Sequence, residues 1–170
     1  MYIAYPKTTP VYMALSNFER MIKLADNVFD IKSDPNQLDV NQDVIERLRL
    51  IHPATVSEYN DANGPVAWVL IIPTTADIMN RFLKCEISEK ELFELTPPDF
   101  SYETLYLCSA LVLEEYRRKG ITKQLVIEAI EKIRQDHPIT ALFVWAFSKE
   151  GDLASEAIAR VVSLPLYRRM

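Results

Sequence analysis

The sequence predicts an α/β or α+β fold in which helices cover both faces of a central sheet. Two observations indicate this fold. A helical stripe of apolar residues over 121–135 lies between two apolar strands, over 104–113 and 141–147. Upstream, the turn-rich segment 60–64 separates two further strands and is typical of a hairpin. The strand–helix–strand unit should form a right-handed parallel crossover, so the sheet is expected to be mixed.

Six strands are expected, each a short apolar run bounded by turn residues. The segment 67–72 is apolar on both faces, so its strand should lie in the middle of the sheet. The run over 104–113 is the longest strand signal. The expected strands cover 11–15, 55–59, 65–73, 104–113, 141–147 and 164–169.

Helices are indicated by apolar residues at helical spacing and by their start signals. Two capping boxes, Ser16 with Glu19 and Ser88 with Glu91, each mark a helix start. The first of these helices should present Phe18, Met21, Ile22, Ala25, Val28 and Phe29 on one face. The other expected helices cover 41–51, 76–84, 121–135 and 152–162. No repeat or linker interrupts this order, which predicts a single domain over 1–170 with a helical insert at about 75–98.

The composition of the chain excludes several kinds of function. The chain has 170 residues, a net charge of -5 and a pI near 5.1, which argues against general binding to nucleic acid or to a membrane surface. The N-terminus has no signal-peptide pattern, so a cytoplasmic location is expected. The two cysteines and two histidines lack ligand spacing, and no metal site is expected. His52 and His137 each precede a proline, which places them at the ends of helices.

The segment 117–122 is the most informative part of the chain. It joins an apolar strand to an amphipathic helix and carries three consecutive cations, Arg117, Arg118 and Lys119. Gly120 is one of only three glycines, and neither GxxxxGK[ST] nor GxGxxG is present. Backbone N–H groups at a helix start, with cations beside them, suit a diphosphate. We therefore interpret this turn as a phosphate cradle for a nucleotide-like cofactor.

The stretch Leu111-Val-Leu-Glu-Glu-Tyr-Arg-Arg-Lys-Gly-Ile-Thr122 resembles the acetyl-CoA loop of the GNAT acetyltransferase superfamily. The resemblance implies a mixed, mostly antiparallel sheet and acetyl-CoA as cosubstrate. It also implies that the backbone at Leu111, Val112 and Leu113 pairs with the pantetheine arm. The implied phosphate-binding residues are Arg117, Arg118, Lys119, Gly120, Ile121 and Thr122, where Thr122 replaces the usual Gly or Ala.

The resemblance implies an N-acetyltransferase in which a primary amine attacks acetyl-CoA directly within a ternary complex. The acceptor is a small molecule or a protein amine. Candidate catalytic residues are Glu103 as base and Tyr167 as acid, and Ser148 is a candidate neighbour of the cofactor. Glu103 could instead be an ordinary charged residue at the end of a strand. Tyr167 could be a packing residue, and Ser148 could be an ordinary turn residue. Cys108 lies inside a strand, where a thiol is usually inert.

Two alternatives remain open at this point. The same fold could serve as a non-catalytic module that binds acyl-CoA or a protein partner, because fold alone does not establish activity. The short C-terminal strand could also leave a sheet edge that pairs with a second copy in a homodimer.

Overall fold

The structure is a computed structural model that describes residues 15–28 and 34–170. Within these residues the sheet has five strands in the order β1-β2-β3-β4-β5. The strands are β1 (Val56–Asp61), β2 (Gly64–Thr74), β3 (Thr104–Val112), β4 (Ala141–Val144) and β5 (Leu166–Arg168). The helices are α1 (Asn17–Val28), α2 (Gln42–Ile51), α3 (Ala76–Leu83), α4 (Glu89–Leu95), α5 (Ile121–Asp136) and α6 (Lys149–Val162), with short 3₁₀ turns η1 (Pro53–Thr55) and η2 (Glu114–Tyr116).

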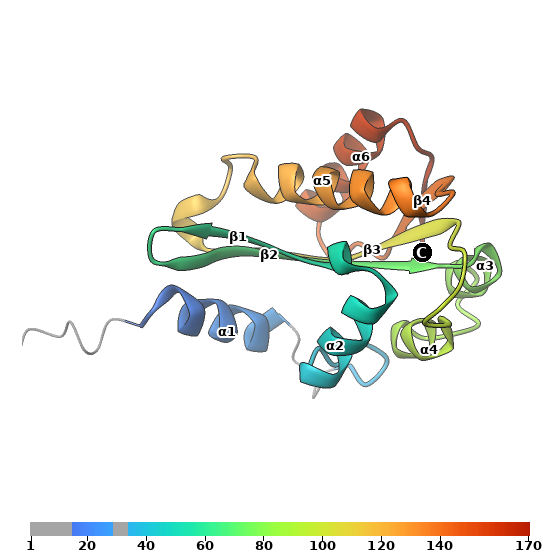
Figure 1. Ribbon diagram of the computed structural model, residues 1–170, viewed down its shortest axis with the longest axis horizontal. Helices are drawn as coiled ribbons and strands as arrows, with labels where there is room; N and C mark the ends of the chain where they lie inside the picture. The colour runs from blue at the N-terminus through green and yellow to red at the C-terminus, as the bar shows by residue number, and fades with distance from the viewer. Residues whose placement is uncertain (1–14, 29–33) are drawn as a thin grey trace, which may run out of the picture.

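Helices cover both faces of the sheet, as the sequence predicts. Figure 1 shows α5 and α6 on one face, and α1, α2 and α4 on the other. The main core lies between these layers, and it includes the buried stripe of α5 at Leu125, Val126, Ala129, Ile130 and Ile133. Within the described residues, no helix is long and apolar enough to cross a membrane.

The sheet is mixed. β1, β2 and β3 are antiparallel neighbours along most of their length, whereas β3, β4 and β5 are parallel and each of these two pairings spans three residues. The helices α3 and α4 lie between β2 and β3 in the chain, where the sequence predicts a helical insert. Both capping boxes form with reciprocal hydrogen bonds, at Ser16 and Glu19 and at Ser88 and Glu91.

Several expected boundaries are wrong. The strand predicted over 141–147 ends at Val144, because the chain turns away from β3 there. The last helix starts at Lys149, earlier than predicted, because the side chain of Ser148 caps it. β2, with 11 residues, is longer than β3 with 9. Of the first expected strand, residues 11–14 lie outside the described residues, and Leu15 is not in a strand.

The expected apolar face of α1 is only partly buried. Met21 is fully buried against Val66, Leu111 and Leu113, which form a small separate core under this helix. Phe18, Ile22 and Val28 are exposed, and Phe29 lies outside the described residues.

Candidate active site

A cavity of about 480 Å³ lies where β3 and β4 separate. The two strands pair only through 104–106 and 141–143, so beyond Tyr106 the β3 backbone has no strand partner on its β4 side among the described residues. A register shift against β2 makes Cys108 an extra residue in β3, and such bulges redirect side chains beside functional sites. The cavity is lined by β3, by the segment after β4, by the first turns of α5 and α6, and by Val28, Gln37 and Glu89 from the opposite face of the sheet.

The turn that precedes α5 has the backbone geometry of an anion cradle. Arg118 and Gly120 both have positive φ, at 61° and 73°. Gly120 is the N-cap of α5 and, in the described structure, supplies no side chain to the first N–H groups of the helix. A Cβ added at Gly120 would meet nothing within 4 Å, so this side of the turn is open. The dipole of a 16-residue helix therefore ends at an uncapped, accessible turn.

The cations of this turn are available to a ligand. Within the part of the chain that the structure describes, Arg117, Arg118 and Lys119 form no ion pair. The ammonium of Lys119 lies over the ring of Tyr116, 5.3 Å from its centroid. The start of α5 therefore directly follows three cations that form no ion pair with a described carboxylate.

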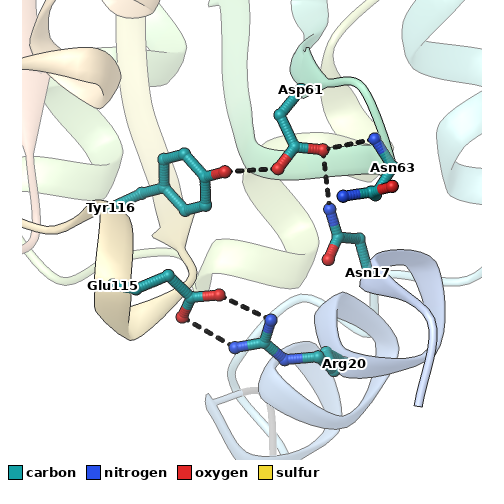
Figure 2. A network of polar contacts seen from close by, with 6 residues as sticks. All are labelled: Asn17, Arg20, Asp61, Asn63, Glu115 and Tyr116. Atoms are coloured by element: carbon teal, nitrogen blue, oxygen red, sulfur yellow. Dashed lines mark hydrogen bonds and ion pairs between the residues drawn. The ribbon is translucent and has the colours of Figure 1, made fainter. Parts of the chain in front are cut away.

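A polar network fixes the chain just before this turn (Figure 2). Glu115 accepts two hydrogen bonds from the Arg20 guanidinium of α1, at 2.6 and 2.7 Å. The Tyr116 hydroxyl donates to Asp61, which also accepts from Asn17 at 2.9 Å. The hydrogen bonds from Arg20 lower the pKa of the Glu115 carboxyl to about 2. The network therefore ties η2 to α1 and to the β1–β2 hairpin, and it positions the turn that follows.

A second helix start lies on the same cavity. Ser148 and Gly151 of the α6 N-terminus line the cavity together with Thr122 and Lys123 of α5. The Ser148 hydroxyl accepts a hydrogen bond from the Gly151 N–H at 3.0 Å, so it caps α6 while facing the cavity. The α5 and α6 N-termini thus lie on one side of the cavity.

The opposite side of the cavity holds a buried carboxylate, Glu89, at the start of α4. Its side chain accepts hydrogen bonds from the Leu38 N–H at 2.8 Å and from the Tyr106 hydroxyl at 2.7 Å, and it lies 3.7 Å from the Cys108 sulfur. Only 5% of the residue is exposed, and this burial raises the pKa of the Glu89 carboxyl. Burial also raises the pKa of the Cys108 thiol well above its ordinary value, which agrees with an inert cysteine.

Ser109 adds an unsatisfied polar atom to the same cavity. Its hydroxyl oxygen is buried and has no hydrogen-bond partner among the described residues. Buried polar atoms almost always have a partner, so a lone one in a residue that lines a cavity indicates that a ligand or water could supply the missing hydrogen bond.

The structure brings some of the expected site residues together. Leu111, Thr122 and Ser148 line the cavity. Val112 and Leu113 end β3 nearby, although the Leu113 N–H already donates to Val66 of β2 at 2.9 Å. The candidate phosphate-binding residues Arg117, Arg118, Lys119, Gly120 and Ile121 form the turn and the first position of α5.

The structure does not bring the two expected catalytic residues to the cavity. Glu103 precedes β3 at the end opposite the turn, and its backbone bonds to Thr74 and Thr140. Tyr167 lies in β5 opposite Phe143, with 47% of its surface exposed. Neither residue lines the cavity, because both lie beside the closed, paired part of the parallel strands.

Sequence reasoning missed Glu89, although a signal exists. Glu89 reads as an ordinary acidic residue in the first turn of a capped helix. Its spacing to Leu92 and Phe93, three and four residues later, places it on the same face as these buried side chains. An acid on the apolar face of a helix is unusual enough to indicate a buried role.

Comparison with known proteins identifies the family of the chain. The family model described as the acetyltransferase (GNAT) family matches residues 42–160, which is more than half of the chain. An aminoglycoside acetyltransferase from an uncultured soil metagenomic sample, solved with trehalose, aligns over 86% of this chain and 82% of its own. Its sequence identity is 18% and its TM-score 0.47. No curated protein matches the sequence. On the strength of the family match, the chain belongs to the acetyltransferase (GNAT) family.

Proposed function

We propose that this protein is an acetyl-CoA-dependent N-acetyltransferase that acetylates a primary amine by direct attack. The observation that carries the proposal is the cavity between β3 and β4, which joins two helix N-termini on one side to a buried carboxylate on the other. Family membership supports acetyl transfer in general, and members of this family generally use acetyl-CoA.

The residues present fit acetyl-CoA. Beyond Tyr106 the β3 edge that faces β4 has no strand partner among the described residues, so this edge can bond to the amides of a pantetheine arm, as in strand addition. The uncapped N–H groups after Gly120 and the cations of the turn suit the pyrophosphate. Thr122, which stands where the family usually has Gly or Ala, lines the same cavity. The cosubstrate would supply an acetyl group activated as a thioester.

A non-catalytic acyl-CoA-binding module is the second candidate, and one observation favours it. Glu103 and Tyr167, the base and acid expected from the sequence, are both outside the cavity. Catalysis would then depend on other groups, or it would be absent.

The test is calorimetric titration of acetyl-CoA into wild type, Gly120→Glu and Gly120→Asn. Asn tolerates a positive φ far better than most residues, so it is a control for backbone strain without added charge. We expect binding by wild type and by Gly120→Asn, and at least a tenfold loss in Gly120→Glu, because the new carboxylate would repel the diphosphate. Wild type that binds no acetyl-CoA would refute the proposal. Binding without thiol release in the presence of amines would support the non-catalytic module.

A further inference from the structure

The cavity has two chemically opposite ends. On one side of the sheet it is bordered by Lys123 and by the N-termini of α5 and α6, which favour negative charge. On the other side, Glu89 is the one acidic side chain among the described residues that line it. A cosubstrate with a diphosphate therefore has a preferred orientation, and its partner should approach from the Glu89 side with a positive charge.

Groups from several elements lie around the Glu89 carboxylate. The Leu38 N–H comes from the segment before α2, the Tyr106 hydroxyl and the Cys108 thiol come from β3, and the charge of Arg169 faces it from beyond β5. These groups hold the carboxylate without neutralising it in an ion pair with a described residue. A buried carboxylate that lines a cavity and has no ion-pair partner among the described residues would be stabilised by a cationic ligand in that cavity.

Part of the cavity wall is apolar. Val28 contributes from α1, and the rings of Trp145 and Phe147 lie next to each other with centroids 4.5 Å apart. Phe147 is 65% exposed, so these rings lead from the surface toward the interior. Such walls suit an alkyl chain better than a sugar or another group rich in hydroxyls, which would lose hydrogen bonds to water there.

From this arrangement we propose that Glu89 binds the acceptor and takes its proton, and that the acceptor is a primary amine at the end of a slender alkyl chain. The inference deepens the proposed function and rests on it. The ammonium gives one proton to the Glu89 carboxylate and becomes a neutral amine. The amine nitrogen bonds to the thioester carbonyl carbon as the carbon–sulfur bond breaks, and the second proton of the nitrogen goes to the departing sulfur. Glu89 then releases its proton to solvent.

Two features of the carboxylate support this role. Burial raises the pKa of the Glu89 carboxyl, which makes the carboxylate a stronger base, and Glu89 lines the cavity. The hydrogen bond from Tyr106 stabilises the charged form and therefore lowers the pKa again. Tyr106 is thus a positioning residue whose removal should move the titration of Glu89 upward.

The experiment compares wild type with Glu89→Gln, Tyr106→Phe and the matched control Glu94→Gln, an exposed acid on the same helix. Each protein is titrated with acetyl-CoA, and thiol release is measured across pH with n-butylamine, tert-butylamine and diethylamine. We expect all four proteins to bind acetyl-CoA within about threefold of one another. In Glu89→Gln, kcat with n-butylamine should fall by about 10²- to 10⁴-fold, the usual contribution of a general base.

Tyr106→Phe should retain activity but move the acidic limb of the pH–rate profile to higher pH, which a purely structural tyrosine would not do. Wild type should prefer n-butylamine over the branched and secondary amines. Wild-type kinetics in Glu89→Gln would overturn the role of Glu89 and leave the proposed function standing, as would an unmoved acidic limb in Tyr106→Phe. Preference for the branched amines would overturn the assigned acceptor class. No acetyl-CoA binding by wild type would overturn both proposals.

Discussion

The Ser109 hydroxyl has no hydrogen-bond partner among the described residues, and this predicts that Ser109→Ala stabilises the protein. A buried hydroxyl without a hydrogen bond costs about 1–3 kcal/mol, and alanine removes that group while keeping most of the side-chain volume. Allowing for water that reaches the cavity, we expect a gain of about 1 kcal/mol, which for a chain of this length raises Tm by about 2–4 °C. Ser57→Ala is the matched control: the Ser57 hydroxyl donates to Ala54 at 3.1 Å, so its loss should destabilise by about 0.5–1.5 kcal/mol.

If acetyl-CoA supplies the hydrogen-bond partner of Ser109, adding it should reverse the order of stability of wild type and Ser109→Ala. A ligand at 100 times its Kd stabilises the folded state by about 2.7 kcal/mol. If Ser109→Ala weakens binding tenfold, the same concentration stabilises the variant by only about 1.4 kcal/mol, so the advantage of the variant disappears. Urea unfolding with and without acetyl-CoA measures both quantities. A variant that is less stable than wild type, with an unchanged gain from acetyl-CoA, would refute the reasoning.

Three further predictions concern charge and packing. Burial raises the folded-state pKa of Glu89 above its ordinary value of 4.5, so the folded protein binds this proton more tightly than the unfolded chain does. Wild type should therefore gain stability relative to Glu89→Gln as pH falls from neutrality through the raised value. Urea unfolding of both proteins between pH 8 and 4 tests this, and a difference in stability that stays constant would contradict it. Because Arg20 lowers the pKa of Glu115 to about 2, the stabilisation from this pair should be complete above pH 4.5 and vanish as pH falls toward 2, and carboxyl titration by NMR should show the low value. Phe82→Ala should cost about 3–5 kcal/mol by denaturant unfolding, because this fully buried ring packs edge-on against Tyr106 and Phe143.

Much of the fold could be predicted because its signals are local. The capping boxes at Ser16 and Ser88 fix helix starts through bonds that span three residues, and both form as expected. The row of apolar residues along one face of α5 and the apolar residues on both faces of β2 are both visible in the sequence, and both are buried in the structure. The turn around Gly120 could be predicted for the same reason, since strand, turn and helix are consecutive in the chain.

The parts that could not be predicted depend on how strands meet in space. The apolar run after Val144 resembles a continuing strand, yet Trp145 and Phe147 are apolar because they line the cavity. The sequence makes Glu103 a candidate base because it lies at the start of the strand that leads to the turn. A strand of nine residues is about 30 Å long, so a residue before its start cannot reach the turn at its end. No glycine or proline marks the bulge at Cys108.

Ser109 and Glu89 together give the strongest reason to regard the cavity as a site. Each lowers the stability of the folded chain, Ser109 through a hydroxyl that has no partner among the described residues and Glu89 through a buried carboxylate. Both face the gap that opens where β3 loses β4, whereas the paired half of these strands is packed with apolar side chains. A cavity kept only by imperfect packing would be more stable if these two positions were apolar. Polar groups that cost stability and line one cavity are typical of sites in which a ligand supplies the missing partners. Replacing Ser109 or Glu89 with an uncharged or apolar residue should therefore make the protein more stable at neutral pH. The same replacement should make it less able to bind its ligands or to acetylate the amine.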